Sequence, residues 1–185
     1  WRDLTGQMLL ERYGMTEIGM ALSNPYRGER RPGYVGQALP DVAVRLVDEE
    51  GGIVTEEGTP GEIRIQSPTV FLEYWGNAEA TEASFAEGWF CTGDIAVIED
   101  GYYRIMGRSS VDIIKSGGYK LSALEIENKL LAHPQIAEVA VVGIADRTWG
   151  EAVAAVVALK GDGDMTLDAL KTWCDGKLSS YKVPK

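Results

Sequence analysis

Short stretches in the middle of the chain carry polar residues that could contact different parts of one ligand. Thr92-Gly93-Asp94 places a carboxylate directly after a glycine, and Gly107-Arg108 places a guanidinium further along. Such an aspartate can accept hydrogen bonds from a vicinal diol, and an arginine can add donors to the same group. The Gly117-Gly118 pair lets backbone approach an extended ligand, because glycine has no Cβ. Each stretch alone is common turn chemistry, but the ordered set indicates a ligand-binding protein.

A second group of polar residues lies near the start of the chain, in Tyr13-Gly14-Met15-Thr16-Glu17. A threonine hydroxyl beside a carboxylate suits a phosphate and its Mg²⁺, because hard cations prefer oxygen ligands. The alternative is a capped turn, in which Thr16 and Glu17 bond only to local backbone. The presence of Asp94 and Arg108 further along favours the ligand-binding interpretation.

Other site chemistries lack the residues that they need. With a single histidine, His133, the chain has neither a Ser-His-Asp triad nor a histidine-rich metal site. Cys91 and Cys174 supply no disulfide framework and no paired metal-ligand spacing. No Gly-x-Gly-x-x-Gly follows a strand, so a dinucleotide-binding turn of that type is unsupported.

Composition limits the class of protein further. The 185 residues suffice for one ordinary domain or two small ones. The net charge of −10 argues against nucleic acid or an anionic membrane as the main partner. No apolar run reaches membrane-spanning length, and a cytoplasmic location is expected, with an organelle as the alternative. The chain starts at Trp1 and stops in Val183-Pro184-Lys185, which reads as interrupted, so we expect a piece of a longer protein.

Hydrophobic alternation predicts a β-rich first part. The predicted elements are a strand at 42–47, an acidic turn at 48–59, a strand at 61–66, a turn at Gly93-Asp94 and a hairpin over 95–106 around Asp100-Gly101. Asp-Gly is typical hairpin-turn chemistry. The first part is therefore predicted to be a β meander.

The second part is predicted as β-β-α-β-β-α, with its helices on one face of the sheet. The predicted elements are strands at 111–115 and 119–121, a helix at 123–132, strands at 136–144 and 152–159, and a last helix capped by Thr166 that carries Leu167, Leu170, Trp173 and Leu178 on its apolar side. Ser122 and Glu125 could form a capping box. The expected fold class is α/β in the broad sense (α+β), with a boundary near 107–112.

Motifs along essentially the whole chain resemble those of the adenylate-forming superfamily of acyl-CoA synthetases, the AMP-binding enzymes. The motifs are Tyr13 to Glu17, Gly61-Glu62-Ile63-Arg64-Ile65, Trp89 to Asp94, and Gly107-Arg108 through Glu127. Within the superfamily, Ser23-Asn24-Pro25-Tyr26 and Arg30-Arg31-Pro32-Gly33 are similar to malonyl-CoA synthetases. The resemblance implies that 1–107 form the C-terminal, β-rich part of the large AMP-binding domain. Residues 108–185 would form the small C-terminal domain.

The resemblance also implies roles for the polar residues near the start. Tyr13 and Gly14 would line the adenine and acyl-adenylate site. Thr16 would contact the phosphate, and Glu17 would bind Mg²⁺. Core packing is the alternative role for Tyr13.

Three roles further along the chain follow from the same resemblance. Asp94 would bind the ribose hydroxyls, with Arg108 as the second ribose contact. Gly117, Gly118 and Tyr119 would lie on the turn that forms the wall of the pantetheine tunnel. Core packing is the alternative role for Tyr119.

Departures from the family pattern concern the hinge and two catalytic elements. The stretch from 108 to 118 is one residue longer than in bacterial malonate enzymes, so the hinge is expected at Ser110 or Asp112. The family's phosphate loop would lie upstream of Trp1, and its catalytic lysine downstream of Lys185. The chain alone is therefore expected to be inactive in adenylation.

Arginines at 27, 30 and 31 stand out in an acidic chain. A substrate with a second carboxylate needs a cation, and arginine can hold a carboxylate by two parallel hydrogen bonds. Arg30 is the candidate substrate contact. The alternatives are a solvated loop and a contact in the missing upstream part.

The predicted function is that of a fragment of an ATP-dependent carboxylate–CoA ligase, most like a malonyl-CoA or methylmalonyl-CoA synthetase. The reaction would use ATP, Mg²⁺ and CoA and pass through an acyl-AMP intermediate, with a small carboxylic acid as substrate. The alternatives are a non-catalytic nucleotide-binding remnant or interaction module, a ligase for another short or medium acid, and an enzyme that loads a carrier protein. No oligomeric state is predicted.

Overall fold

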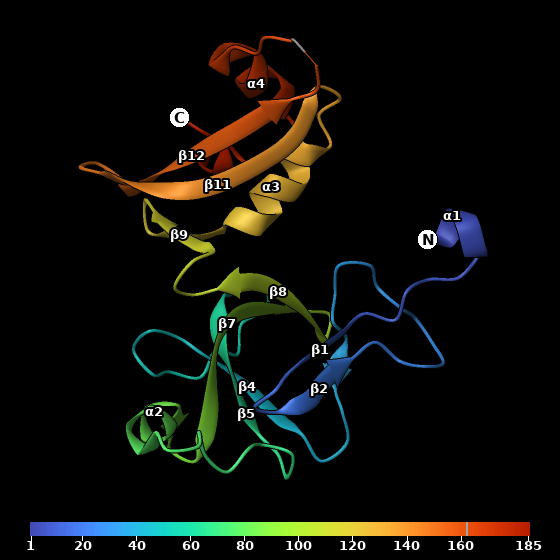
Figure 1. Ribbon diagram of the computed structural model, residues 1–185, viewed down its shortest axis with the longest axis vertical. Coiled ribbons are helices and arrows are strands. Elements are labelled where there is room, and N and C mark those ends of the chain that lie inside the picture. Colours follow the sequence, from blue (N-terminus) through green and yellow to red (C-terminus); the bar gives the residue numbers. More distant parts are fainter. Residues whose placement is uncertain (162) are drawn as a thin grey trace. The chain divides into compact units, whose positions relative to one another are not determined.

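The computed structural model describes residues 1–161 and 163–185 (Figure 1). The chain divides into two compact units, Trp1–Ile105 and Met106–Lys185. Among these described residues, each unit has its own hydrophobic core, and the two cores share no residue.

Antiparallel strands build most of the first unit. A three-stranded sheet has the order β1-β2-β3, and a five-stranded sheet has the order β4-β5-β7-β6 with β8 beside β7. The bounds are β1 Arg12–Met15, β2 Gly19–Ser23, β3 Gln37–Ala38, β4 Ala43–Val47, β5 Gly61–Gln66, β6 Phe85–Ala86, β7 Trp89–Glu99 and β8 Tyr102–Arg108. Two short helices, α1 (Arg2–Thr5) and α2 (Ala78–Ala83), complete the unit.

The core of the first unit forms on the inner face of β5. Ile63 and Ile65 are fully buried, whereas Glu62 and Arg64 between and beside them are only half-buried. This alternation is the period-two pattern from which the strand was predicted. Phe90 of β7 packs edge-on against Phe71 and Phe85, with ring centroids 5.5 Å and 5.6 Å apart.

Two features of the first unit differ from the sequence predictions. The predicted turn at Gly93-Asp94 is wrong, because β7 continues through both residues as one long strand. The pairing with β5 shifts register there, so the glycine forms an irregularity inside a strand. Helix α2 was not predicted; Asn77 caps it by accepting a hydrogen bond from Ala80 N at 3.1 Å.

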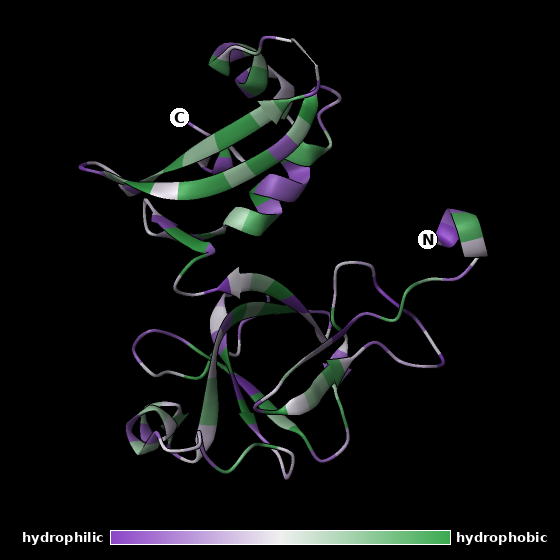
Figure 2. Ribbon diagram, in the orientation of Figure 1, coloured by the Kyte–Doolittle hydropathy of each residue, from purple (hydrophilic) through white to green (hydrophobic). Residues whose placement is uncertain are grey.

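The second unit has the predicted order β-β-α-β-β-α, and its sheet has the order β10-β9-β12-β11. The bounds are β9 Ile113–Ser116, β10 Tyr119–Ser122, α3 Ala123–Leu131, β11 Ile136–Asp146, β12 Gly150–Leu159, α4 Leu167–Cys174 and the 3₁₀ turn η1 Ser180–Lys182. Figure 2 shows hydrophobic residues along β11 and β12, while α3 carries both hydrophobic and hydrophilic residues. The predicted α+β class is confirmed.

Both helices of the second unit contribute to one core. Ile126 and Leu130 of α3 lie in the same cluster as Leu170 and Cys174 of α4, together with Val153 of β12. Shared burial in one cluster stabilises the two helices through their apolar sides, as short helices require. Among the described helices, none is long and apolar enough to span a bilayer.

Side-chain caps define where these helices begin. Ser122 Oγ accepts a hydrogen bond from Glu125 N at 3.0 Å, and Thr166 Oγ1 accepts one from Ala169 N at 3.2 Å. These contacts satisfy backbone donors that a helix start leaves unpaired. The side chain of Glu125 accepts from Lys182 Nζ at 2.6 Å.

The end of the last helix was predicted too late. Helix α4 ends at Cys174, and Gly176 follows with φ +70°. Leu178 N donates to Cys174 O at 3.0 Å, so the chain turns back at this point. Leu178 therefore lies beyond the helix, although its side chain still packs on the core.

A charged cluster beside the β7–β8 hairpin predicts acid sensitivity of the first unit. Arg104 Nη2 donates to Glu99 Oε1 at 2.7 Å, and the Tyr34 hydroxyl donates to Glu99 Oε2. The hydrogen bond from Arg104, followed by that from Tyr34, lowers the pKa of Glu99 below its ordinary value of 4.5. Because the folded-state pKa is lowered, the carboxylate stabilises the fold above the unfolded-state pKa. That contribution is lost as pH falls through the folded-state pKa.

Substitution Glu99→Gln in the full-length protein should therefore lower the thermal midpoint by a few degrees at pH 7 and by less near pH 3.5. Midpoints of wild type and variant measured across this range check the prediction. A difference that stays constant with pH would contradict it.

Candidate functional site

Thr16 and Glu17 lie at the tip of the β1–β2 hairpin. Ile18 N donates to Met15 O at 3.2 Å and closes the turn, and the buried Ile18 side chain anchors it. Thr16 is exposed and Glu17 is half-buried. The hairpin therefore presents a hydroxyl and a carboxylate side by side at its tip.

Gly14 allows the two strands of this hairpin to approach closely. A Cβ at residue 14 would collide with the backbone carbonyl of Gly19. The strand register shifts between Tyr13 and Gly14, which marks the same close approach. A glycine is thus required here by backbone packing, independently of any contact with an adenine ring.

Two residues predicted to contact nucleotide meet directly in the first unit. The Tyr13 hydroxyl donates to Asp94 Oδ2 at 2.7 Å. The residues are separated by 81 positions in the sequence and come together because β1 and β7 lie in the same unit. An aromatic ring and a half-buried carboxylate are therefore adjacent.

The loop after β5 braces the carboxylate at the hairpin tip. The Tyr74 hydroxyl donates to Glu17 Oε1 at 2.9 Å, and Phe71 N donates to Glu17 O at 2.7 Å. Thr69 Oγ1 adds a bond to Ile18 O at 2.8 Å. Sequence reasoning did not identify Tyr74, because nothing local in the sequence indicates that it reaches Glu17.

The residues at the hairpin tip fit a Mg²⁺ ion. Mg²⁺ is usually bound through one or two carboxylates together with waters and substrate phosphates, and Glu17 offers one such carboxylate beside the Thr16 hydroxyl. Within 1–161 and 163–185, no three or more His, Cys, Asp and Glu side chains gather as a protein-only metal cage. One carboxylate beside one hydroxyl suits a Mg²⁺ ion whose other ligands are nucleotide phosphates and waters.

The predicted hinge segment is closed by its own hydrogen bonds in the second unit. Arg108 N donates to Asp112 Oδ2 and Asp112 N donates to Arg108 O, both at 2.8 Å. Ala123 N also donates to Asp112 O at 2.8 Å. Gly107 has φ +131°, where a Cβ would meet the Asp112 side chain. Asp112 thus organises the segment, whereas Ser110 lies exposed within it.

The Gly117-Gly118 pair forms the turn between β9 and β10. Their φ angles of +59° and +84° are the left-handed values that a two-residue hairpin turn demands. Gly117 N donates to Trp149 O at 2.8 Å, and a Cβ at residue 117 would lie 3.0 Å from the Trp149 ring. The turn is therefore held from the side by the β11–β12 connection.

Tyr119 follows this turn and is exposed. Its ring stacks on Tyr181 with centroids 4.7 Å apart and an interplanar angle of 10°. Lys185 Nζ lies 3.7 Å from the centroid of the Trp149 ring. Sequence reasoning identified Tyr119 but missed Trp149, whose role depends on the fold of a distant hairpin.

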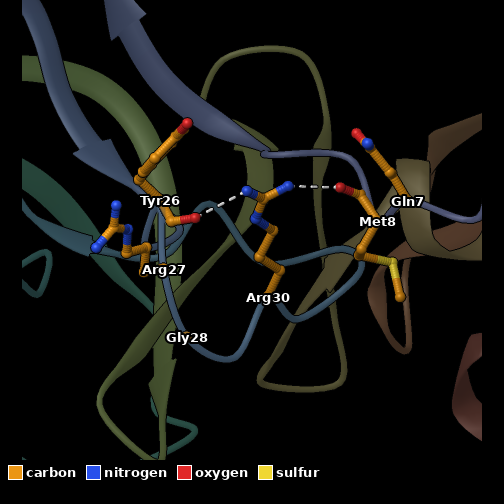
Figure 3. Close-up of a pocket in the computed structure, with 6 residues that line it drawn as sticks. All are labelled: Gln7, Met8, Tyr26, Arg27, Gly28 and Arg30. Carbon is orange, nitrogen blue, oxygen red and sulfur yellow. Dashed lines mark hydrogen bonds between the residues drawn. The ribbon is translucent and has the colours of Figure 1, made fainter.

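Arg30 lies beside a pocket of about 600 Å³ in the first unit (Figure 3). The pocket is lined by Gln7, Met8, Tyr26, Arg27, Gly28 and Arg30. Arg30 donates to the carbonyl oxygens of Met8 at 2.7 Å, Tyr26 at 2.9 Å and Pro25 at 3.3 Å. The guanidinium therefore ties the loop together, and its contact with a substrate stays a prediction.

Two sequence models of one enzyme family match the chain. The first, described as AMP-binding enzyme, matches residues 1–75. The second, described as AMP-binding enzyme C-terminal domain, matches residues 125–185. Together they cover more than half of the chain, which belongs to the AMP-binding enzymes.

Relatives within the family include malonate–CoA ligases. The mitochondrial malonate–CoA ligase ACSF3 of Mus musculus is 52% identical over all of this chain, which covers 35% of that protein. The malonate–CoA ligase of Arabidopsis thaliana is 49% identical, with 100% of this chain and 32% of that protein covered. The chain thus spans about a third of the curated relatives that it matches.

A solved structure supports the same family. The crystal structure of ATP-bound MatB from Rhodopseudomonas palustris is 41% identical to this chain, with a TM-score of 0.86. The alignment covers 100% of this chain and 37% of that one. The fold described above is therefore the fold of this part of an AMP-binding enzyme.

The close approach at Gly14 predicts a stability defect on adding one methyl group. Gly14→Ala should destabilise the full-length protein by about 2 kcal/mol, because the new Cβ meets a backbone carbonyl that cannot move freely. Denaturant unfolding measures the change. Gly163→Ala is the matched control, since its Cβ would meet nothing closer than 3.8 Å. Equal effects of the two substitutions would refute the packing explanation.

Proposed function

We propose that this chain is the C-terminal part of an ATP-dependent carboxylate–CoA ligase that acts on malonate. The observation that carries the proposal is its 52% identity, over its whole length, to a malonate–CoA ligase. The contact between Tyr13 and Asp94 supports the nucleotide-binding part, because it pairs an aromatic ring with a carboxylate suited to a ribose diol.

The proposed domain boundary lies two residues after the division between the two compact units, Trp1–Ile105 and Met106–Lys185. Residues 1–107 would be the end of the large AMP-binding domain, and 108–185 the small C-terminal domain. The hinge would be Ser110 or Asp112. The bonds of Asp112 to the backbone at 108 and 123 support its candidacy, since breaking them would free the segment to change conformation.

In the proposed first step, the substrate carboxylate attacks the α-phosphate of ATP. An acyl–phosphate bond forms, and pyrophosphate leaves. Asp94 would accept hydrogen bonds from the ribose hydroxyls, Arg108 would add a second ribose contact, and Tyr13 and Gly14 would lie against the adenine. Thr16 would bond a phosphate oxygen. Mg²⁺, held by Glu17, would supply charge stabilisation at the phosphates.

In the proposed second step, the CoA thiolate attacks the acyl carbonyl, and AMP leaves. Gly117 and Gly118 would let the backbone approach the pantetheine arm, because neither carries a Cβ. Tyr119 would lie beside the same arm. The bond from Gly117 N to Trp149 O supports this role, since it holds the turn in one shape.

The proposed substrate class is short dicarboxylic acids, with malonate or methylmalonate as the acid and CoA as the acceptor. Arg30 remains the proposed contact for the second carboxylate. The mitochondrial name of the mouse relative supports an organellar location over a cytoplasmic one.

Acid-dependent ATP–pyrophosphate exchange by the full-length protein tests this function. Malonate should support exchange at least about 10-fold faster than acetate or a medium-chain acid, because a cation at the site would favour a second carboxylate. Preference for a monocarboxylic acid would exclude malonate as the substrate but would still support a carboxylate–CoA ligase. Absence of exchange with every acid would refute the ligase proposal.

Replacement of Asp94 by Asn tests the ribose contact. The variant loses a charge-assisted hydrogen bond of about 1.5–3 kcal/mol, so its KM for ATP should rise about 10- to 100-fold. Steady-state kinetics of the full-length protein measures the change. Asp100→Asn is the control, because Asp100 lies at a left-handed position (φ 49°) that asparagine tolerates. An unchanged KM for ATP in Asp94→Asn would refute the assignment of Asp94 to the ribose hydroxyls.

A further inference from the structure

Strand β7 bulges where it carries Asp94. Glu62 of β5 pairs with Ile95, and Arg64 pairs with Cys91. Ile63 alone therefore lies opposite Thr92, Gly93 and Asp94, which we call the Thr92–Asp94 bulge. Gly93 has φ +72° within it, a value that favours glycine.

Side chains accept hydrogen bonds from two backbone donors of the bulge. Gly93 N donates to Glu62 Oε1 at 3.1 Å, and Asp94 N donates to Thr92 Oγ1 at 3.1 Å. The buried Thr92 hydroxyl in turn donates to Ile63 O at 2.7 Å. A bulge disrupts ladder bonds, and partly buried backbone donors need other partners. Glu62 supplies one of these partners from the neighbouring strand.

The Glu62 carboxylate is itself fixed in place. Arg64 Nε donates to Glu62 Oε2 at 3.1 Å, and the two side chains are only 16% and 23% exposed. Arg64 also lies directly across the strand pair from Arg45 of β4. Arg45 has its own partner, because its Nη2 donates to Glu87 Oε2 at 3.1 Å. Glu62 therefore pairs with Arg64 through one oxygen and holds the bulge through the other.

We infer that Glu62 is a positioning residue for Asp94. It holds Gly93 N and so fixes the bulge from which the Asp94 carboxylate reaches the Tyr13 hydroxyl. Glu62 acts through the backbone and does not contact the ligand. The inference deepens the proposed function and rests on it, since the ribose is what Asp94 would bind.

Kinetics of three variants of the full-length protein test this role. Glu62→Ala removes the acceptor for Gly93 N and should raise the KM for ATP about 10-fold, because small displacements of binding groups are costly. The KM values for malonate and CoA should stay within about twofold of wild type. Glu62→Gln keeps an oxygen for Gly93 N, so its KM for ATP should return to within about threefold.

Glu99→Gln is the control for loss of an ion pair in the same unit. Glu99 bonds Arg104 and Tyr34 beside the β7–β8 hairpin, so its loss should leave the KM for ATP unchanged. A Glu62→Ala variant with an unchanged KM for ATP, alongside an active wild type, would overturn the inference. Equal loss in Glu62→Ala and Glu62→Gln would also overturn it, because the acceptor would then not matter.

Amide hydrogen exchange separates this inference from the function itself. A peptide covering residues 90–96 should take up deuterium at least about 10-fold faster in Glu62→Ala than in wild type or Glu99→Gln, because Gly93 N loses its partner. Unchanged uptake would overturn the role of Glu62 whatever the activity. Absence of pyrophosphate exchange in the wild type would instead refute the proposed function. Faster deuterium uptake in Glu62→Ala would still show that Glu62 holds the bulge.

Discussion

The pairing of β5 with β7 is the constraint on which the first unit depends. Strand β5 lies between β4 and β7, so both of its edges are bonded. One of its faces supplies fully buried isoleucines to the core, and the other supplies the half-buried Glu62 and Arg64. Because successive side chains of a strand point to opposite faces, the isoleucines of β5 pack in the core while Glu62 on the other face holds the bulge. A one-residue slip would exchange these faces and lose both.

Local patterns were sufficient to predict much of the fold. Alternation located β5, an Asp-Gly pair located the β7–β8 hairpin, and Ser122 and Thr166 located the helix starts. Each signal lies within a few residues and reflects a local preference of the backbone. The end of α4 was missed because Leu178 keeps a helical spacing although the chain has already turned at Gly176.

Contacts between distant segments were beyond local patterns. Gly93-Asp94 reads as a turn because glycine and aspartate favour turns, and only the register against β5 shows that the strand continues. Tyr74 and Trp149 reach their partners through tertiary packing. The candidate site residues could therefore be identified from the sequence. The hydrogen bond between Tyr13 and Asp94 could be seen only in the folded structure. Their roles toward ligands remain proposals.

Ser122 shows how one atom can restrict the sequences that a family tolerates. Its Oγ accepts from Glu125 N and also donates to Met106 O at 2.5 Å, so it caps α3 and bonds to the chain before it. Asparagine, aspartate, serine and threonine usually replace one another at a helix start. An ionised aspartate can only accept, and an asparagine amide divides donor and acceptor between two atoms. Relatives should therefore carry only serine or threonine at this position, although a helix start alone would also accept asparagine or aspartate.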